Sequence, residues 1–147
     1  MTEATVKTSC SIPPVVALHK YFIRANKMRT DFDELLKVNG PAKQLDLDIC
    51  MSYWYAGLYV VIEGWNELKL NDAKIDTLLK MAEFVGLLRR YRNGVFHFQA
   101  DYFDKRFVDV LSQEKDYVKW IRKLNSELGR FFLEWFKRYD NEHPKAS

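Results

Sequence analysis

Apolar side chains recur every three or four positions along most of this chain, the spacing that gathers them on one face of an α-helix. The first such stretch predicts a helix that begins at the proline pair of residues 13–14, because proline is tolerated in a first helical turn. The glycine and proline of residues 40–41 end this helix. Its apolar face comprises Leu18, Phe22, Ala25, Phe32 and Leu35.

A second helix is predicted from Asp46 to Leu68, and it is apolar on two faces rather than one. A helix of this kind belongs at the centre of a bundle. We expect neighbouring helices on one face and a second subunit as the candidate contact of the other. The first face carries Trp54, Leu58, Val61, Trp65 and Leu68, and the other carries Tyr53, Ala56 and Val60.

Periodic apolar residues predict a third helix over residues 75–92. Either Asn71 or Asp72 can cap its start, and Gly94 is expected to interrupt its end. Two turn-forming residues before the helix and a glycine after it are typical of helix boundaries.

Residues 97–112 are predicted to form a loop with a short helix around Asp104–Leu111. Ser112 is expected to cap a long final helix. The apolar stripe of this last helix comprises Tyr117, Ile121, Leu124, Leu128, Phe131, Trp135 and Tyr139.

Together these segments predict an all-α fold, an up-and-down bundle of four to five helices. The chain has 147 residues, 48% of them hydrophobic, which fits one domain with a substantial core. We place this domain at residues 14–140, between a flexible N-terminal arm at 1–13 and a C-terminal tail at 141–147.

The composition also bears on where the protein resides. No apolar run approaches the roughly 20 residues that span a bilayer, and the first ten residues lack the basic start and apolar stretch of a secretory signal. Two cysteines, Cys10 and Cys50, cannot make a disulfide framework. We therefore expect a soluble cytoplasmic protein that makes no membrane contact.

The net charge of +3 is confined to one stretch of the chain. Between Arg89 and Arg106 there are five basic residues and two acidic ones, whereas the two kinds balance elsewhere. Such a stretch suits an anion-binding site, with an ordinary solvated surface as the alternative.

Several familiar types of site are excluded because the chain lacks the sequence motifs that they require. The chain has neither a phosphate-binding glycine loop nor a nucleophile elbow, and its histidines and cysteines lack metal-ligand spacing. We expect neither a metal nor a cofactor. His19 lies beside the apolar face of the first helix, where a partly buried structural histidine is the more frequent case.

The segment RNGVFH, residues 92–97, carries the strongest candidate site. Arg92 continues the apolar stripe of the third helix, where a guanidinium needs an anion or several acceptors. A salt bridge to Glu63, on a mostly apolar face of the second helix, is the structural alternative. His97 lies about 140° around a straight helix from Arg92. The two share one site only if the backbone folds back near Gly94, or if two chains pair and both contribute to a joint cleft.

An arginine, a histidine and an amide without a metal suit the cleavage of RNA by its own 2′-hydroxyl. His97 can remove or supply a proton, and Arg92 can stabilise the charge that builds on the phosphorane. Asn93 can orient the histidine or the phosphate. The substrate supplies the nucleophile, so no serine, cysteine or aspartate is required.

At these residues the chain resembles the HEPN superfamily (higher eukaryotes and prokaryotes nucleotide-binding domains), whose signature is R-x(4–6)-H with a polar residue, often Asn, after the arginine. The segments RRYRNGVFHFQADYF and YWYAGLYVVIEGWNEL also look like HEPN sequences. The resemblance implies a dimerising helical bundle whose two motifs meet at a cleft, and metal-independent ribonuclease activity. It makes Arg92 the transition-state stabiliser, His97 the general acid/base and Asn93 the supporting polar residue.

The same resemblance implies partners. Many members are toxins of toxin–antitoxin pairs or act in defence against phage, so we expect a homodimer, an RNA substrate and a possible antitoxin protein. Some toxin members carry a tyrosine two places after the histidine, where the antitoxin adds nucleotide. This chain has Gln99 there, which argues against that form of regulation.

Residues around the motif are candidates for further contacts with RNA. Arg89 and Arg90 suit phosphate groups, with a solvated helix end as the alternative. Tyr91 and Phe98 suit base stacking, with a core or dimer contact as the more frequent role. The leading hypothesis is a homodimeric endoribonuclease. Its alternatives are a non-catalytic helical module that binds a nucleotide or a protein partner, and a dimeric scaffold without a ligand.

Overall fold

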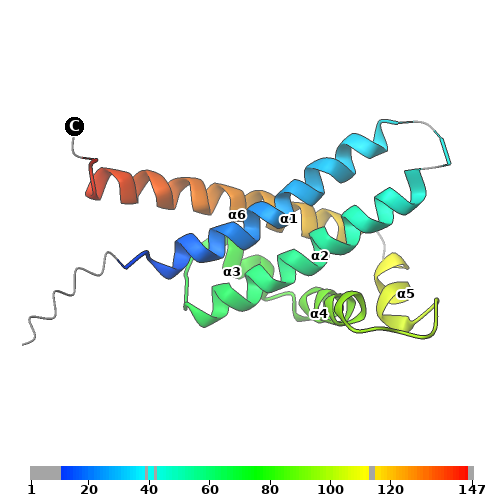
Figure 1. Ribbon diagram of the computed structural model, residues 1–147. Coiled ribbons are helices and arrows are strands. Elements are labelled where there is room, and N and C mark those ends of the chain that lie inside the picture. The colour runs from blue at the N-terminus through cyan, green and yellow to red at the C-terminus, as the bar shows by residue number, and fades with distance from the viewer. Residues whose placement is uncertain (1–10, 39, 42, 113–114, 146–147) are drawn as a thin grey trace, which may run out of the picture.

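The computed structural model describes residues 11–38, 40–41, 43–112 and 115–145. These residues form helices and turns and no strand, which confirms the all-α prediction. Six helices are present within them, one more than the upper end of the predicted range of four to five. They are α1 (Pro14–Leu36), α2 (Lys43–Glu67), α3 (Ala73–Leu79), α4 (Ala82–Phe96), α5 (Lys105–Leu111) and α6 (Lys115–Glu142) (Figure 1).

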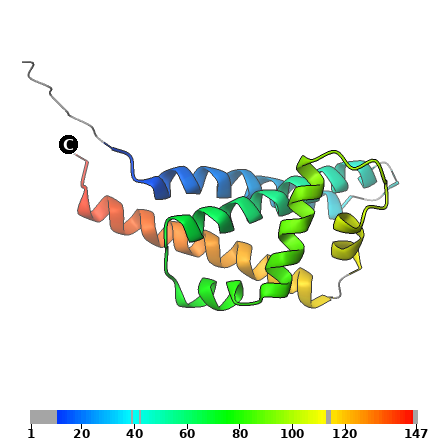
Figure 2. The same cartoon turned by 90° about the horizontal axis from the view of Figure 1, so that it is seen from below.

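The three long helices make up the body of the molecule. α1 and α2 form an antiparallel hairpin, and α6 runs in the same direction as α2, so that α1 begins and α6 ends at the same end of the molecule (Figure 1). α4 does not follow this up-and-down arrangement. It lies across the other helices, and the view from below shows it crossing in front of them (Figure 2).

The predicted third helix is two helices, α3 and α4. Asp72 caps α3 by accepting the backbone N–H groups of Lys74 and Ile75, as one of the two predicted caps. The chain then leaves the helical region at Met81, whose ψ is 74°. Apolar spacing did not reveal this break, because both pieces bury apolar residues against the same core and neither glycine nor proline marks the junction.

The prediction that Gly94 interrupts the helix is wrong, because α4 continues through Gly94 to Phe96. The glycine serves packing instead. A Cβ atom at this position would lie 3.0 Å from the ring of Phe107 and 3.1 Å from Cβ of Arg106. The missing side chain therefore lets α5 approach α4 closely.

Other predicted boundaries shift in the structure. α2 begins at Lys43, before the expected Asp46. Ser112 ends α5, where its backbone N–H bonds to the carbonyls of Val108 and Val110. Its predicted cap of the last helix depends on residues that are not described. α6 begins at Lys115 and runs to Glu142, into the predicted tail, while residues 113–114 lie outside the described chain. Most of the predicted arm, with Cys10, and residues 146–147 also lie outside it.

α2 is the central helix, as its two apolar faces predict. It packs against α1 and against α4, so the chain itself covers much of both faces. On the second face Ala56 is fully buried, Val60 is half-buried and Tyr53 is 51% exposed. By length and composition alone α2 would pass as a membrane-spanning helix, but eight of its side chains are buried in the bundle, as in a core helix.

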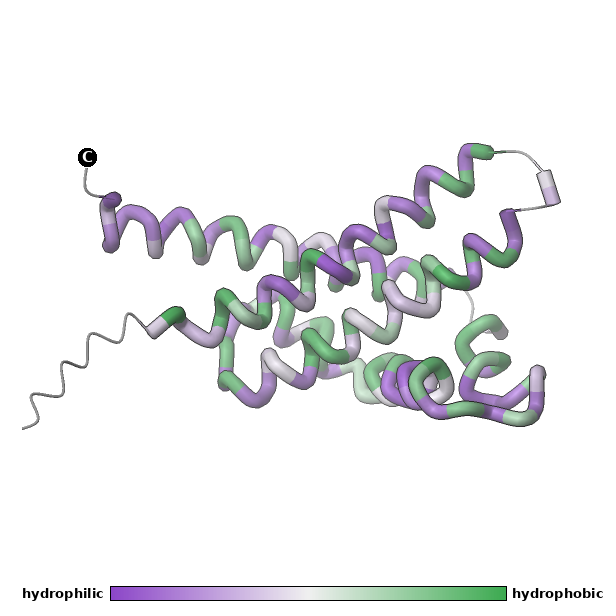
Figure 3. The backbone as a smooth tube through the Cα atoms, viewed as in Figure 1, coloured by the Kyte–Doolittle hydropathy of each residue, from purple (hydrophilic) through white to green (hydrophobic). Residues whose placement is uncertain are grey.

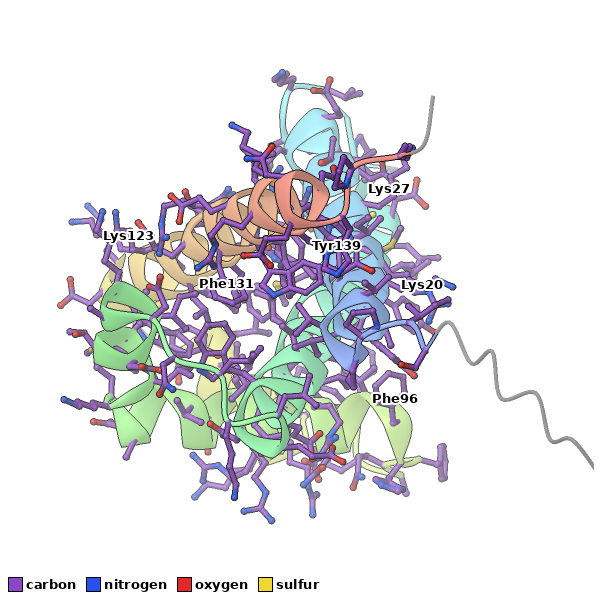
Figure 4. The ribbon with its side chains drawn as sticks, turned by 90° about the vertical axis from the view of Figure 1, so that its left-hand side faces the viewer. Lys20, Lys27, Phe96, Lys123, Phe131 and Tyr139 are labelled. Atoms are coloured by element: carbon purple, nitrogen blue, oxygen red, sulfur yellow. The ribbon has the colours of Figure 1, made fainter. Side chains whose placement is uncertain are left out.

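α6 closes the core from the other side. Hydrophilic and hydrophobic residues alternate along it in the pattern of an amphipathic helix (Figure 3). Of the predicted stripe, the part from Tyr117 to Phe131 is buried, and Trp135 and Tyr139 are half-buried. Figure 4 shows Phe131 among the packed side chains and Phe96 at the outer edge of α4.

Two polar connections hold the long helices in alignment. The indole Nε1 of Trp54 donates to Oδ1 of the buried Asn125 at 3.1 Å, and Nδ2 of Asn125 donates to Oδ1 of Asn26 at 3.0 Å. These bonds link α2 to α6 and α6 to α1. Arg122 on α6 adds an ion pair to Asp33 on α1, with Nη2 and Oδ1 2.7 Å apart. The Arg122 guanidinium lowers the pKa of the Asp33 carboxyl by hydrogen bonding.

His19 lies among aromatic rings where α1 meets α6. Its ring centroid is 5.1 Å from that of Phe132 and 4.7 Å from that of Phe136. Burial lowers the pKa of His19 below its ordinary value of 6.5, since burial disfavours the charged imidazolium. The prediction of a partly buried histidine in the core agrees with this position.

The lowered pKa of His19 predicts a pH-dependent contribution to stability. The unfolded chain takes up the proton first as the pH falls below 6.5, so the free energy of unfolding should decrease from pH 7 towards pH 5. In a His19→Phe variant this decrease should be smaller. Urea denaturation at several pH values measures it, with His143→Gln at the exposed C-terminal end as the control. Equal pH slopes for wild type and His19→Phe would contradict the assignment.

Candidate functional site

Arg92 lies where α4 crosses α2, and three groups orient its guanidinium. Nη1 is 2.6 Å from Oε1 of Glu63, so the predicted ion pair is present. Nε donates to Oδ1 of Asn93 at 3.0 Å. The guanidinium carbon also lies 4.7 Å from the ring centre of Tyr59 on α2, a cation–π contact. The Arg92 side chain is only 22% exposed, so these contacts restrict it to one orientation.

Tyr59 was not predicted from the sequence, although a signal for it exists. It precedes Glu63 by four residues on α2, and residues four apart share a helix face. Tyr59 is therefore one of the neighbours that a side chain paired with Glu63 across the helix crossing can reach, and Arg92 does reach it. This spacing could have identified the aromatic contact once the ion pair was assumed.

The arrangement leaves part of Arg92 available to a ligand. Nη2 forms no hydrogen bond with any described residue, whereas Nε and Nη1 are engaged. A guanidinium presents its donors in a planar fork that matches phosphate and carboxylate oxygens. Glu63 is 46% exposed at its side chain, so solvent reaches the ion pair from outside. The geometry suits one further anionic oxygen at the Nη2 edge.

His97 follows the last residue of α4 and has an extended backbone, with φ −120° and ψ 124°. Its backbone N–H still bonds to the carbonyl of Asn93 at 3.0 Å. The imidazole is exposed and forms no hydrogen bond with the described residues. It is not packed beneath Phe96 and Phe103, whose rings are 54% and 73% exposed. The His97 side chain is therefore accessible to solvent.

The structure does not connect Arg92 and His97 within one chain. No hydrogen bond joins their side chains in the described residues, and the fold-back near Gly94 that would join them does not occur. α4 is unbroken up to Phe96, so residue 97 lies about 140° around the helix axis from Arg92. The other predicted route to a shared site, the pairing of two chains, stays a prediction.

The neighbouring candidates divide into exposed and buried residues. Arg89 and Arg90 are exposed on the outer face of α4; Arg90 lies 3.8 Å from Asp109, and Arg89 has no ion pair within the described chain. Tyr91 is buried, with its hydroxyl 3.3 Å from Oγ of Ser52, and burial raises its pKa to about 12. Tyr91 is therefore a core residue rather than a stacking candidate.

Comparison with known proteins adds no relative. No family model, curated protein or solved structure matches this chain.

Proposed function

We propose that this protein is a metal-independent endoribonuclease of the HEPN type, which works as a homodimer with Arg92, Asn93 and His97 of both copies at a joint cleft. The observation that carries the proposal is the state of the two key side chains. Arg92 is fixed by Glu63, Asn93 and Tyr59 with one edge available, while His97 is exposed just after the end of an unbroken helix. One chain presents both groups but does not join them, as expected of half a site.

An exposed apolar strip on α2 is a candidate contact surface for a second copy of the chain. Before α4 crosses it, α2 exposes Leu45, Ile49 and Tyr53 at four-residue spacing, with exposed fractions of 69%, 43% and 51%. A contiguous apolar strip of this kind is typical of an interface. We place the dimer contact on this strip, next to the end of α4, where Tyr53 packs against Phe96 with ring centroids 6.4 Å apart.

The reaction needs only a base, an acid and an electrostatic stabiliser. His97 of one copy takes the proton of the 2′-hydroxyl, and O2′ attacks the adjacent phosphorus. Arg92 of the other copy donates to the non-bridging oxygens as negative charge builds on the phosphorane. The bond from phosphorus to O5′ breaks, and the leaving oxygen receives the proton that the same His97 took from the 2′-hydroxyl. The products carry a 2′,3′-cyclic phosphate and a 5′-hydroxyl.

Regulation by a partner antitoxin belongs to this proposal as well. Gln99 occupies the place where some HEPN toxins carry a modifiable tyrosine. Its amide nitrogen donates to the carbonyl of His97 at 2.8 Å, and its amide oxygen accepts from Arg106 at 3.0 Å. The residue thus holds the loop after His97, and we expect an antitoxin to act by binding rather than by nucleotide addition.

One observation favours the non-catalytic alternative. Glu63 holds a carboxylate oxygen 2.6 Å from Arg92, in a place that a phosphate oxygen would otherwise occupy. A module that recognises a nucleotide or a protein through this face needs no more than binding. The two functions differ in whether RNA is cut.

Incubation of purified protein with RNA in EDTA tests the proposed function. We expect cleavage that leaves 2′,3′-cyclic phosphate ends, because the substrate hydroxyl is the nucleophile. His97→Ala protein, prepared identically, is the control and should not cleave. Equal cleavage by both would indicate a contaminating nuclease. Binding of RNA without cleavage by wild-type protein would favour the module.

A further inference from the structure

The loop between α4 and α5 exposes aromatic side chains to an unusual degree. Phe98, Tyr102 and Phe103 are 94%, 88% and 73% exposed. The rings of Tyr102 and Phe103 contact each other edge to face, with centroids 5.0 Å apart, while Phe98 makes no ring contact with the described residues. Exposed apolar surface of this extent in so short a segment is typical of a binding site.

The loop that carries these rings is held by specific bonds. Arg106 on α5 donates to Gln99 at 3.0 Å and lies 3.1 Å from a carboxylate oxygen of Asp104. Asp101 accepts the backbone N–H of Phe103 at 2.9 Å, and Asp104 accepts the backbone N–H of Arg106 at 2.9 Å. The rings are thus presented from a fixed backbone, and both acidic side chains of the loop are engaged internally.

The charges around the rings favour an anionic ligand. Lys105, two residues after Phe103, is exposed at the start of α5, and Arg89 and Arg90 are exposed on α4, with Arg90 3.8 Å from Asp109. Exposed aromatic rings beside cations are the arrangement with which proteins bind single-stranded nucleic acid, since rings stack on bases and cations meet phosphates.

We propose that Phe98, Tyr102 and Phe103 form a stacking surface for the bases of single-stranded RNA beside the cleft. This inference rests on the proposed function for its substrate class. It assigns these three residues to substrate contact, and it explains why they remain exposed while the nearby Tyr91 and Phe107 are packed in the core. Duplex RNA offers no free base faces, so the surface selects for unpaired segments.

Binding of a 2′-O-methyl oligonucleotide tests the inference without any cleavage, because this probe has no nucleophilic hydroxyl. Fluorescence polarisation compares wild-type protein with the Phe98→Ala/Tyr102→Ala/Phe103→Ala variant. We expect the affinity to fall about a hundredfold or more, as stacking is worth roughly tenfold or more for each base. An abasic phosphodiester strand of the same length should bind wild type as weakly as the oligonucleotide binds the variant.

Three controls separate stacking from other roles. Phe98→Trp keeps a ring and should retain affinity, and Leu133→Ala removes an exposed apolar side chain from α6 without effect. The oligomeric state of the triple variant, measured by light scattering, should equal that of wild type. The inference would be overturned by unchanged affinity in the triple variant or by tight binding of the abasic strand. It would also be overturned if wild-type protein did not bind the oligonucleotide, or if the triple variant lost the dimer. The binding experiment does not measure cleavage. A failure of the ribonuclease test and a failure of the stacking test can therefore be told apart.

Discussion

Mixing the Arg92→Ala and His97→Ala variants should restore RNA cleavage that neither variant has alone. Removal of the arginine should lower kcat by about 10²–10³, as for other electrostatic stabilisers, and removal of the histidine by about 10²–10⁴. Both side chains are at or near the surface, so the fold should survive both changes. A mixed dimer keeps Arg92 from one copy and His97 from the other.

The expected size of the recovery follows from random pairing. The joint cleft of a dimer holds two pairs, each made of Arg92 from one copy and His97 from the other. Half of the dimers in an equal mixture are mixed, and each keeps one of these two pairs, which gives about a quarter of wild-type activity. The control mixes Arg92→Ala with an Arg92→Ala/His97→Ala chain, which has no Arg92 and should stay inactive. The assay measures cyclic-phosphate ends after the two chains have exchanged subunits. Activity in the mixture no higher than in the separate variants would rule out a site shared in this way.

Trp54→Ala should destabilise the protein by about 4 kcal/mol, the range for a buried large aromatic. Trp54 is 1% exposed and packs against Phe32 and Tyr55, with ring centroids 5.6 Å and 5.0 Å away. Its loss also leaves the buried Asn125 without the indole donor. Against a typical total of about 5–15 kcal/mol, this is a large share of the stability. Urea denaturation measures the change.

Two further variants apportion the effect of Trp54. Trp54→Phe keeps much of the ring but removes the donor to Asn125, so its cost should be about 1–2 kcal/mol. Trp135→Ala removes a half-buried tryptophan from α6 and should cost less than Trp54→Ala. If Trp54→Ala costs no more than Trp135→Ala, the central place given to Trp54 is wrong.

Periodicity predicted the long helices well because each buries a continuous stripe. α1 begins at Pro14 as the proline pair indicates, and the stripe of α6 from Tyr117 onward faces the core. The break at Met81 was missed because no residue there opposes a helix, so the turn depends on packing between distant segments. The prediction at Gly94 was wrong for a related reason. A glycine occurs both at helix ends and where a neighbouring helix packs closely, and the sequence does not distinguish the two.

The ion pair in the candidate site was predictable, and the exposure of the loop was not. Glu63 and Arg92 are charged residues on mostly apolar faces, and such residues tend to pair with each other. Phe98 and Tyr91 are both aromatic residues in the same segment of the sequence, yet Phe98 is 94% exposed and Tyr91 is 1% exposed. Exposure depends on whether another segment covers the residue, and α5 covers Tyr91, through Phe107, but not Phe98.

The hydrogen-bonded chain from Trp54 through Asn125 to Asn26 also determines the register of the three long helices. Apolar side chains tolerate sliding, since one leucine contact replaces another at little cost. A slip of α6 by one turn, about 5.4 Å, would instead leave the amide of Asn125 unpaired in the core. The core thus selects a single alignment among several of similar hydrophobic content. By fixing this register, a polar residue that adds little to net stability gives the fold its uniqueness.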